Sequence, residues 1–344
     1  MRSLASVQII SDIVPIEGAD RIELVKILGW QCVANKGTFN KGDKCIYFEI
    51  DSFLPVCDRF EFLRKSSYKN NEIMGEGFRV KTMTLRGEIS QGLALPLSDF
   101  PELKNVEVGQ DVTGQLHVKK WDMPEVSIGN EILINSKPDF IGRTDETRIQ
   151  SIPEVLNEFK GLDYYITTKC DGTSRCIGIN ETGDFYCTSQ SNTIKESMFV
   201  DYVKENNYEE LLRNYMKEKN LNSIVVAGEW CGYGIQKNKL QLKKPCWYIF
   251  TVKENGKRVS YDELCTVVKA LSANMVMVDE IGTDLPTKYP TIEALLEKAH
   301  GFYPNGGVRE GIVIRPLKPV YSKTLNGPLS IKVINNKYLL KNKD

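Results

Sequence analysis

The stretch "YYITTKCDGTSR", residues 164–175, places a lysine at the end of an apolar run that is typical of a β-strand. Two positions after Lys169 comes the dipeptide Asp171-Gly172. Asp-Gly is a common turn dipeptide, so one interpretation is a strand that simply ends in a turn. The other is that Lys169 is a nucleophile held at the strand end beside Asp171. The rest of the sequence decides between these interpretations.

The composition of the chain bounds its architecture and its partners. A length of 344 residues predicts two domains. The 45 basic and 45 acidic residues balance, which argues against a general polyanion-coating protein but leaves room for a local basic groove. No apolar run is long enough for a transmembrane helix, and the first residues lack the shape of a signal peptide, so we expect no membrane association.

The cysteines and histidines narrow the chemistry. Nine scattered cysteines without a CxxC pair indicate reduced thiols, and therefore an intracellular protein of the cytoplasm or nucleus. The two histidines, His117 and His300, are too few for Ser-His-Asp or Cys-His catalysis or for most zinc sites. An enzyme of this composition must work with Lys, Arg, Asp, Glu and bound metal.

The pattern along the chain predicts two different folds. Residues 1–118 are rich in β-branched and aromatic residues between Gly- and Asp-containing turns, with one amphipathic helix at 58–68. They predict a small closed all-β barrel, OB-like in our first interpretation, although an SH3-like barrel would give nearly the same pattern. Residues 119–149 have weak periodicity and are interpreted as a linker. Residues 150–344 alternate helices and paired strands without a βαβ rhythm, which predicts an α+β domain with antiparallel sheets.

Five short polar blocks lie beside apolar strands of the second domain, whereas the P-loop pattern GxxxxGK[ST] is absent. Each block alone is weak: Glu229 could be a strand-end charge that faces water, and Lys332 could guard a sheet edge. Together and in this order they form a specific pattern. The blocks are residues 169–172, 227–230, 247–252, 309–315 and 330–333.

This pattern resembles the covalent nucleotidyltransferase superfamily, which includes ATP-dependent DNA and RNA ligases and GTP-dependent mRNA capping enzymes. The resemblance covers residues of about 160 to 340. It implies that Lys169 attacks ATP to form lysyl-AMP, that Glu229 contacts the ribose and that Phe250 stacks on the purine. It also implies that Lys332 contacts the α-phosphate and takes part in catalysis. For Phe250, core packing is the alternative, with Trp247 as the other candidate for stacking.

The residue types suit this chemistry. A lysine that attacks a phosphate forms a covalent intermediate and divides strand sealing into easier steps. Attack needs the free amine, so we expect cationic or metal-rich surroundings to lower the pKa of Lys169. Mg²⁺ or Mn²⁺ would neutralise the phosphates. The predicted metal contacts, made through water, are Asp171, Glu229 and Glu310. The predicted ATP contacts also include Thr167, Thr168, Asp171, Gly172 and Glu310. Because stacking is tolerant of base identity, we expect hydrogen bonds from backbone groups near Thr167 and Thr168 to identify the purine.

Domain order narrows the family further. A barrel precedes the five blocks and no domain of that size follows Lys332, which resembles the RNA ligase branch with an N-terminal OB domain and a C-terminal nucleotidyltransferase domain. The chain departs from many ligases in two places. Ser330 stands at the first of two lysine positions, and the segment around Gln190 lacks an arginine. Arg175, Lys195 or Arg315 could replace that arginine.

The sequence therefore predicts a monomeric ATP-dependent RNA ligase that joins 3′-hydroxyl and 5′-phosphate RNA ends in nicked duplexes, through lysyl-AMP and RNA-adenylate. Arg79, Lys81 and Arg86 of the barrel, with Arg175, are candidate RNA contacts, because alternate basic residues on a strand share one face. A solvated strand face is the alternative. A DNA ligase, a GTP-dependent capping-like enzyme and an inactive RNA-binding protein that retains the fold are the other functions to be weighed.

Overall fold

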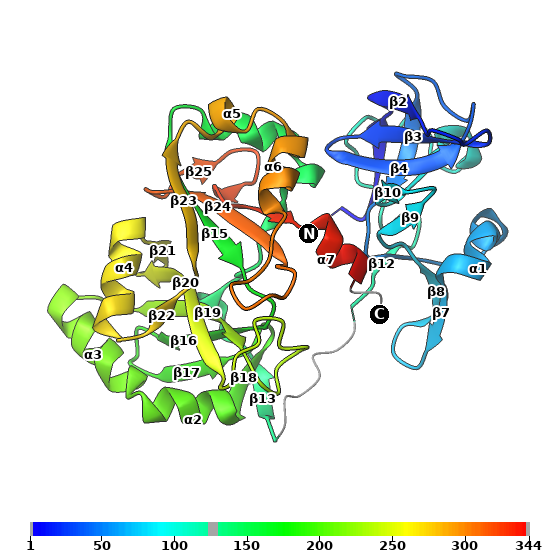
Figure 1. The fold of residues 1–344 in the computed structure, drawn as a ribbon. Coiled ribbons are helices and arrows are strands. Elements are labelled where there is room, and N and C mark those ends of the chain that lie inside the picture. The colour runs from blue at the N-terminus through cyan, green and yellow to red at the C-terminus, as the bar shows by residue number, and fades with distance from the viewer. Residues whose placement is uncertain (1–2, 123–129, 342–344) are drawn as a thin grey trace. The chain divides into compact units, whose positions relative to one another are not determined.

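The computed structural model describes residues 3–122 and 130–341, which fall into two compact units (Figure 1). Unit 1 contains residues 1–125 and 340–344, and unit 2 contains residues 126–339. The predicted linker is divided between them. Strand β12 (Lys119–Lys120) pairs inside unit 1, whereas β13 (Ile132–Ser136) and β14 (Thr147–Arg148) join the sheets of unit 2.

Unit 1 is built from short antiparallel strands around a core that includes Phe48, Phe60 and Phe78. Its described strands form separate sheets rather than one closed barrel, so the predicted closure was wrong. The reason lies in residues 78–97, which break into strands of three to five residues around a tight turn at Arg86-Gly87. The sheets are β1-β5-β11 (Ala5–Ile9, Lys44–Phe48, Leu93–Pro96), β2-β3-β4 (Asp12–Pro15, Ile22–Ile27, Trp30–Asn35), β9-β10 (Met83–Leu85, Glu88–Ser90) and β12-β6-β8-β7, in which the last three are Ser52–Leu54, Gly75–Arg79 and Tyr68–Asn71.

The helix predicted at 58–68 is present as two consecutive pieces. A 3₁₀ helix, Asp58–Leu63, leads into the short helix α1 (Arg64–Ser67). Phe60 is buried and its ring meets Phe48 edge-on at 5.5 Å, whereas Phe62 is exposed. One apolar side chain thus fixes the segment to the core, and the tighter 3₁₀ geometry suits so short an element.

The two main sheets of unit 2 are antiparallel apart from the β14–β27 and β20–β22 pairs. The larger has the order β13-β18-β17-β16-β19-β20-β21, with β22 also beside β20. The smaller has the order β14-β27-β24-β15-β23. Their remaining bounds are β15 (Asp163–Lys169), β16 (Thr173–Ile179), β17 (Phe185–Thr188), β18 (Asn192–Glu196), β19 (Ile224–Cys231), β20 (Cys246–Glu254), β21 (Lys257–Arg258), β22 (Asn274–Met275), β23 (Val278–Thr283), β24 (Gly311–Pro316) and β27 (Ile331–Ile334).

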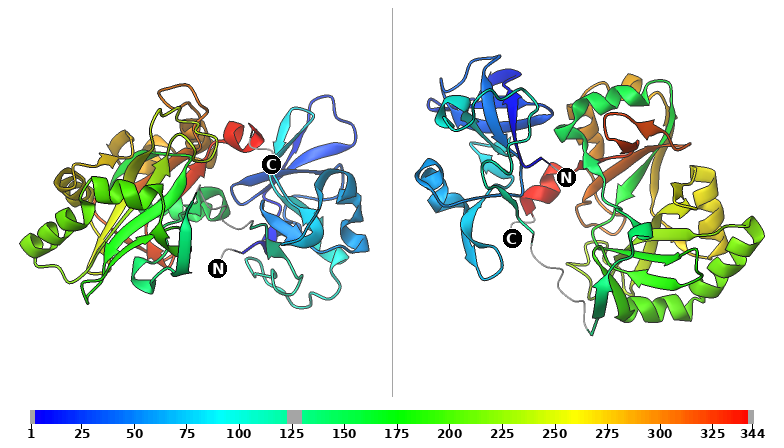
Figure 2. Two further views of the ribbon diagram at one scale, coloured as in Figure 1. Left: turned by 90° about the horizontal axis from the view of Figure 1, so that it is seen from below. Right: turned by 180° about the vertical axis from the view of Figure 1, so that it is seen from behind.

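Helices cover one face of the larger sheet. Helices α2 (Met198–Glu205), α3 (Tyr208–Lys219) and α4 (Tyr261–Ala270) contribute to one core with the apolar residues of β19 and β20, and Figure 2 shows these green-to-yellow helices together beside the strands. Ser260 and Glu263 form a capping box that starts α4. No helix in the described ranges is long and apolar enough to cross a membrane.

The smaller sheet has its own core, to which residues 153–159 and helices α5 (Leu285–Lys288) and α6 (Ile292–Ala299) contribute. The chain passes from this sheet to the larger one between the end of β15 and the start of β16. A short hairpin, β25 (Tyr321–Ser322) and β26 (Gly327–Pro328), separates β24 from β27, and helix α7 (Asn336–Lys341) follows β27. The sequence blocks at residues 169–172 and 309–315 therefore meet at one end of the smaller sheet.

Candidate active site

Lys169 is the last residue of β15, and strand register sets its partner. Its Cα pairs with Gly311, the first residue of β24, so the preceding residue, Glu310, lies beside the lysine. The Nζ atom of Lys169 is 2.8 Å from Oε1 of Glu310. A Cβ on Gly311, whose φ is +157°, would lie 2.1 Å from the carbonyl oxygen of Val333. Glycine thus allows β24 to begin against β27, which places Glu310 at the nucleophile candidate.

Acidic neighbours control the protonation of Lys169. Burial alone would lower the pKa of this amine, but the charges of Glu310, Glu229 and Asp145 outweigh burial and raise the pKa above its ordinary value. The lysine is therefore an ammonium ion at neutral pH. This direction is opposite to the one predicted from the sequence, because the protein groups gathered around the amine are mainly carboxylates.

Glu229 lies near the end of β19, opposite Ser174 of β16. Burial raises the pKa of Glu229 to about 7; Lys169 opposes the rise, and the charges of Glu310 and Asp171 add to it. Carboxylates that repel one another in this way favour a nearby cation. The three predicted acidic residues and Lys169 therefore form one electrostatic cluster.

Gly172 explains the dipeptide that follows the lysine. A Cβ at this position would lie 2.4 Å from the carbonyl oxygen of Trp230, so glycine is required for close packing against β19. Asp171 points to another cation, Lys239, with 3.2 Å between Oδ2 and Nζ. The Lys239 ammonium also lies 3.8 Å from the ring centroid of Tyr338. The bend at 171–172 is thus fixed on both sides.

Lys332 lies on β27 and pairs with an acid that the sequence had not indicated. Its Nζ is 2.5 Å from Oδ1 of Asp145, whose side chain is 64% exposed although that of Lys332 is only 13% exposed. Burial lowers the pKa of Lys332; Asp145 opposes this effect, and Lys169 and Arg148 reinforce it. The pKa of Asp145, which burial alone would raise, is lowered by Lys332 and Lys169. Lys332 and Lys169 thus share an acidic neighbour.

Phe250 is the extra residue of a β-bulge, because it falls between Ile249 and Thr251, which pair with consecutive residues of β19. Alternation along β20 places Phe250, like Tyr248, on the face opposite the fully buried Trp247 and Ile249, which belong to the helix-covered core, and the bulge shifts the alternation so that Val252 faces that core again. Phe250 is only half-buried and packs on the other side, near Cys170 and Tyr303. Of the two aromatic candidates, Phe250 is the one placed toward the cluster around Lys169.

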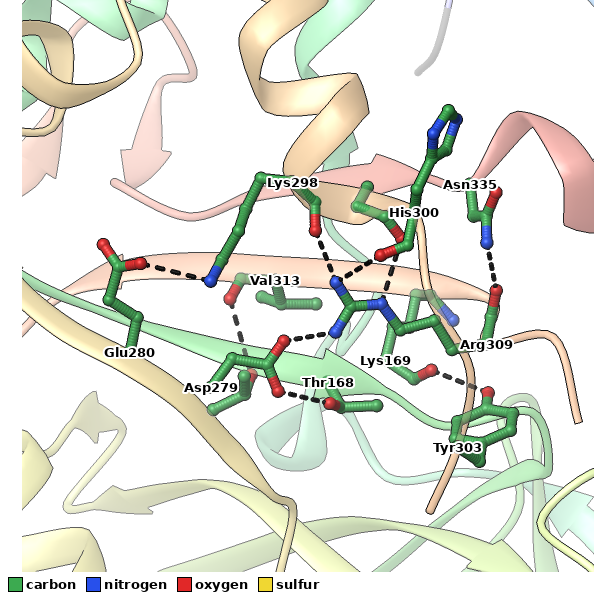
Figure 3. Close-up of polar contacts among 12 residues, drawn as sticks. Thr168, Lys169, Asp279, Glu280, Lys298, His300, Tyr303, Arg309, Val313 and Asn335 are labelled. Carbon is green, nitrogen blue, oxygen red and sulfur yellow. Dashed lines mark hydrogen bonds and ion pairs between the residues drawn. The ribbon is translucent and has the colours of Figure 1, made fainter. Parts of the chain in front are cut away.

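Tyr303 connects the two members of the central ion pair. Its hydroxyl donates to the carbonyl oxygen of Lys169 at 2.8 Å (Figure 3). The same hydroxyl accepts from the amide of Glu310 at 3.1 Å. The side chain is 2% exposed, so both bonds are sheltered from water. One buried phenol thus fixes the end of β15 relative to the start of β24.

Arg309 organises the backbone around this pair (Figure 3). Its guanidinium donates to the carboxylate of Asp279 and to the carbonyl oxygens that end α6, among them those of Ala299 at 3.0 Å and His300 at 2.9 Å. Asp279 in turn accepts from the hydroxyl of Thr168 at 2.6 Å. The network joins α6, β23 and β15, and it holds the residue next to Lys169.

The two threonines predicted to identify the purine are buried in β15. The hydroxyl of Thr167 donates to the carbonyl oxygen of Val313 at 3.4 Å, and the amide of Thr168 donates to that of Met277 at 2.9 Å. These groups are engaged inside the fold. Recognition of the purine by Thr167 and Thr168 stays a prediction.

The predicted RNA contacts of unit 1 do not share one strand face. Arg79 ends β8, Lys81 lies beyond that strand, and Arg86 occupies the turn between β9 and β10 with a φ of +51°. The Arg79 guanidinium lies 5.1 Å from the ring centroid of Trp121. The periodicity argument therefore does not support these three residues as a single RNA clamp.

The three basic residues that could replace the absent arginine differ in exposure. Arg175 is buried and lies 2.8 Å from Glu131. Arg315 is also buried, 2.7 Å from Glu146, and it donates to the carbonyl oxygen of Phe250. These two arginines support the interior, and neither presents an exposed guanidinium to RNA. Lys195, on β18, is the exposed one of the three.

The donor set suits a hydrated divalent cation. In the described part of the chain, no three His, Cys, Asp or Glu side chains converge closely enough to hold a metal directly. The charges of Asp171 and Glu310 nevertheless act on Glu229, and those of Glu229 and Glu310 act on Lys169. Mg²⁺ keeps several of its waters and meets carboxylates partly through them, so these residues fit such an ion.

Sequence reasoning missed five residues of the site. Arg309 had a usable signal, since it directly precedes Glu310, and Asp145-Glu146 formed an acidic pair inside a segment interpreted as a linker. Lys239 and Tyr303 gave no signal, because single lysines and tyrosines in loops are common. Their importance depends on contacts between residues distant in sequence.

Comparison with known proteins finds similar domains and similar whole structures. The family model for RNA ligases matches residues 162–334, and one for an OB-fold domain matches residues 4–97. An apo variant of the Naegleria gruberi RNA ligase is similar over 100% of this chain and 99% of its own, with 32% identity and a TM-score of 0.88. A variant of that ligase solved with ATP and Mn is 31% identical over 99% of each chain, also with a TM-score of 0.88. No curated protein matches by sequence.

Proposed function

The chain belongs to the RNA ligase family, and we propose that it seals nicks in RNA duplexes in three steps that begin at Lys169. It is an ATP-dependent RNA ligase. The proposal extends this activity to a substrate, in which a 3′-hydroxyl and a 5′-phosphate lie side by side on a continuous strand. It also assigns roles to individual residues.

One observation carries the proposal. The Lys169 ammonium is held 2.8 Å from Glu310 by strand register and by the Tyr303 hydroxyl, at a site where Glu229 and Lys332 also act on it. An amine fixed at a strand end among carboxylates is suited to nucleophilic attack once it has lost its proton. A lysine that only ended a strand would not need this support.

The first proposed step transfers AMP to the protein. The Nζ atom of Lys169 loses a proton and bonds to the α-phosphorus of ATP, and the bond from that phosphorus to the bridging oxygen breaks, releasing pyrophosphate. In the second step an oxygen of the RNA 5′-phosphate bonds to the phosphorus of the AMP group, the bond from that phosphorus to Nζ breaks, and the released Lys169 amine takes up a proton. In the third, the 3′-hydroxyl attacks the activated 5′-phosphorus, loses its proton, and AMP leaves with the bonding electrons.

The acidic cluster fits the divalent cation that such chemistry uses. When bound, Mg²⁺ or Mn²⁺ would supply positive charge to the phosphates. Asp171, Glu229 and Glu310 would hold it through water. Glu310 has a second role in this proposal, because its carboxylate is the group that now keeps the proton on Lys169. Redirecting that carboxylate toward a cation would lower the pKa of the amine.

The other roles follow from position. Phe250, on the face of β20 opposite the helix-covered core, would stack on the purine, and such stacking contributes about 1–3 kcal/mol for a base. Glu229 would contact the ribose. Lys332 would exchange its exposed partner, Asp145, for the α-phosphate. The nine free thiols support action inside the cell, where cysteines stay reduced, and we propose that the enzyme acts there as a monomer.

The test separates the first step from the last. Wild-type protein incubated with α-labelled ATP and Mg²⁺ should retain label through denaturation, Lys169→Ala should not, and Lys160→Ala, an exposed lysine of the same unit, should behave as wild type. Lys169→Ala should still seal a nick that carries a pre-adenylylated 5′ end. Labelling by GTP in place of ATP would overturn the proposal in favour of a capping-like enzyme.

A pair of substrates tests whether the enzyme distinguishes an RNA 3′ end from a DNA 3′ end. Nicked duplexes that differ only in ribose or deoxyribose at the 3′-hydroxyl nucleotide should be sealed at clearly different rates. Equal rates would contradict specificity for RNA ends and would favour a DNA ligase. Failure of both wild type and Lys169→Ala to form labelled protein would favour an inactive RNA-binding protein.

A further inference from the structure

Two loops of unit 2 meet beside the nucleophile. One, residues 232–245, joins β19 to β20, and the other, residues 300–310, joins α6 to β24 (Figure 1, yellow-green and orange). The side-chain amide of Asn305 donates to the carbonyl oxygen of Leu240 at 3.4 Å. A Cβ on Gly307 would lie 2.1 Å from the carbonyl oxygen of Lys239. The loops are therefore in direct contact.

Each loop also contacts the catalytic segment. Lys239 of the first lies 3.2 Å from Asp171. Tyr303 of the second binds the carbonyl oxygen of Lys169. Whatever occupies the outer surface of these loops lies next to the residues that carry out adenylate transfer.

Buried side chains and hydrogen bonds fix both loops to the rest of unit 2. Ile235 and Leu240 are buried in two different cores. The side chain of Asn238 makes two hydrogen bonds of 3.0 Å with the backbone of Leu242. In the other loop, the amide of Tyr303 donates to the carbonyl oxygen of Gly307 at 2.7 Å. Their exposed side chains are thus presented by ordered backbone.

The exposed side chains are of two kinds. Tyr233 and Phe302, one on each loop, are 75% and 65% exposed, the two highest values for large hydrophobic side chains among the described residues. Lys243 and Lys244 are exposed on the first loop. Residues 231–245 and 300–309 contain no Asp or Glu, in a chain whose total charge is zero. Aromatic rings and amines without carboxylates match the chemistry of a nucleic-acid strand.

We propose that these loops form an RNA-binding surface, called here the loop platform and defined by Tyr233, Phe302, Lys243 and Lys244, which binds the strand beside the end to be sealed. The rings contact base or ribose faces at the strand end, and the lysines contact phosphates. This inference rests on the proposed function, since it concerns the RNA that the enzyme seals.

The test compares two double variants with matched controls. Tyr233→Ala with Phe302→Ala removes the rings, and Lys243→Ala with Lys244→Ala removes the charges. Tyr321→Ala, at a side chain 63% exposed, and Lys217→Ala with Lys219→Ala, on the exposed surface of α3, are the controls within unit 2. The probe is a nicked RNA duplex with a pre-adenylylated 5′ end, and binding and single-turnover sealing are measured with the full chain.

The ring variant should raise the Kd for the nicked duplex about 10- to 100-fold. The lysine variant should reduce the slope of log Kd against log salt by about 1.5. Both should form lysyl-AMP from ATP at the wild-type rate, which also verifies that they are folded. The controls should bind and seal as wild type does.

Three results would decide against the platform. Platform variants that bind and seal like the controls would overturn it, as would a loss of lysyl-AMP formation by folded variants, which would assign the loops to the nucleotide instead. Equal weakening of RNA binding by the control variants would show that the loss is not specific to the loop platform. If the wild type neither forms lysyl-AMP nor binds the duplex, the proposed function itself fails, and that outcome is distinguishable from the other three.

Discussion

The carboxylate of Asp145 lies 2.5 Å from the ammonium of Lys332, and it is mostly exposed whereas the lysine is mostly buried. Its neighbour Glu146 is anchored in the interior by Arg315 at 2.7 Å and Arg258 at 3.4 Å. Asp145 is therefore held at the site by the backbone. In this position the Asp145 carboxylate pairs with the lysine that we propose to bind the α-phosphate of ATP. Asp145 and the nucleotide would therefore compete for the same ammonium group.

Replacing Asp145 should make ATP binding easier. Asp145→Asn removes the competing charge, and because the pair is exposed on one side the apparent KM for ATP in lysyl-AMP formation should fall about two- to fivefold. The measurement is the rate of labelling against ATP concentration. Glu181→Gln, at an exposed acid elsewhere in unit 2, should leave KM unchanged. A higher KM in Asp145→Asn would show that Asp145 assists binding.

Removing the Tyr303 hydroxyl should slow the first step more than it weakens ATP binding. Tyr303→Phe leaves the Lys169 carbonyl and the Glu310 amide without their shared partner, which should reduce the single-turnover rate of lysyl-AMP formation at saturating ATP by about 10- to 100-fold. Tyr289→Phe, which loses a 2.8 Å bond to Glu280, is the matched control. Equal rates in the two variants would contradict a positioning role for Tyr303.

Glu229 should make the metal-free protein less stable as the pH rises. Its pKa is about 7 in the folded chain against an ordinary 4.5, so the folded state holds the proton more tightly. Between these values the folded chain binds more protons than the unfolded chain, and stability falls with increasing pH. The Tm of Glu229→Gln relative to wild type should therefore rise by about 5 °C from pH 4.5 to pH 8. Parallel Tm curves would contradict the raised pKa.

Glu146, whose side chain is only 10% exposed, should contribute strongly to the stability of the fold. Glu146→Gln leaves Arg315 and Arg258 without a counter-charge in the interior, and the loss in unfolding free energy should be about 3–5 kcal/mol. Glu209→Gln breaks an exposed pair with Arg213 and should change it by less than about 1 kcal/mol. Chemical denaturation of both variants measures the difference. Similar losses would show that Glu146 is not structurally special.

Much of unit 2 was predictable because its signals are local. Glu310 and Gly311 precede an apolar run that had to be a strand, and Lys169 ends another. The order of the five blocks along the chain then indicated that their side chains belong to one site. The turn at Asn255-Gly256 follows the same logic, since both residues have the positive φ that a tight hairpin needs.

What could not be predicted depends on contacts across the chain. Asp145 reaches Lys332 from 187 positions away, and Tyr303 reaches Lys169 from 134. The predicted lowering of the Lys169 pKa was also wrong, because the direction of the shift depends on how many carboxylates the fold brings near the amine. In unit 1 the strands are too short for periodicity to show how they pair, which is why the closed barrel was predicted and separate sheets were found.

Position 250 is separate from the packing of the helix-covered core. Alternation along β20 places Phe250 with Tyr248 on the face opposite Trp247 and Ile249, and the bulge lets Val252 return to the core. Substitution at position 250 could therefore change the strength of the proposed purine contact while Trp247 and Ile249 keep their neighbours. The cost in packing would fall on the small buried cluster beneath Phe250, which contains Ile141, Cys176, Val225 and Ala227.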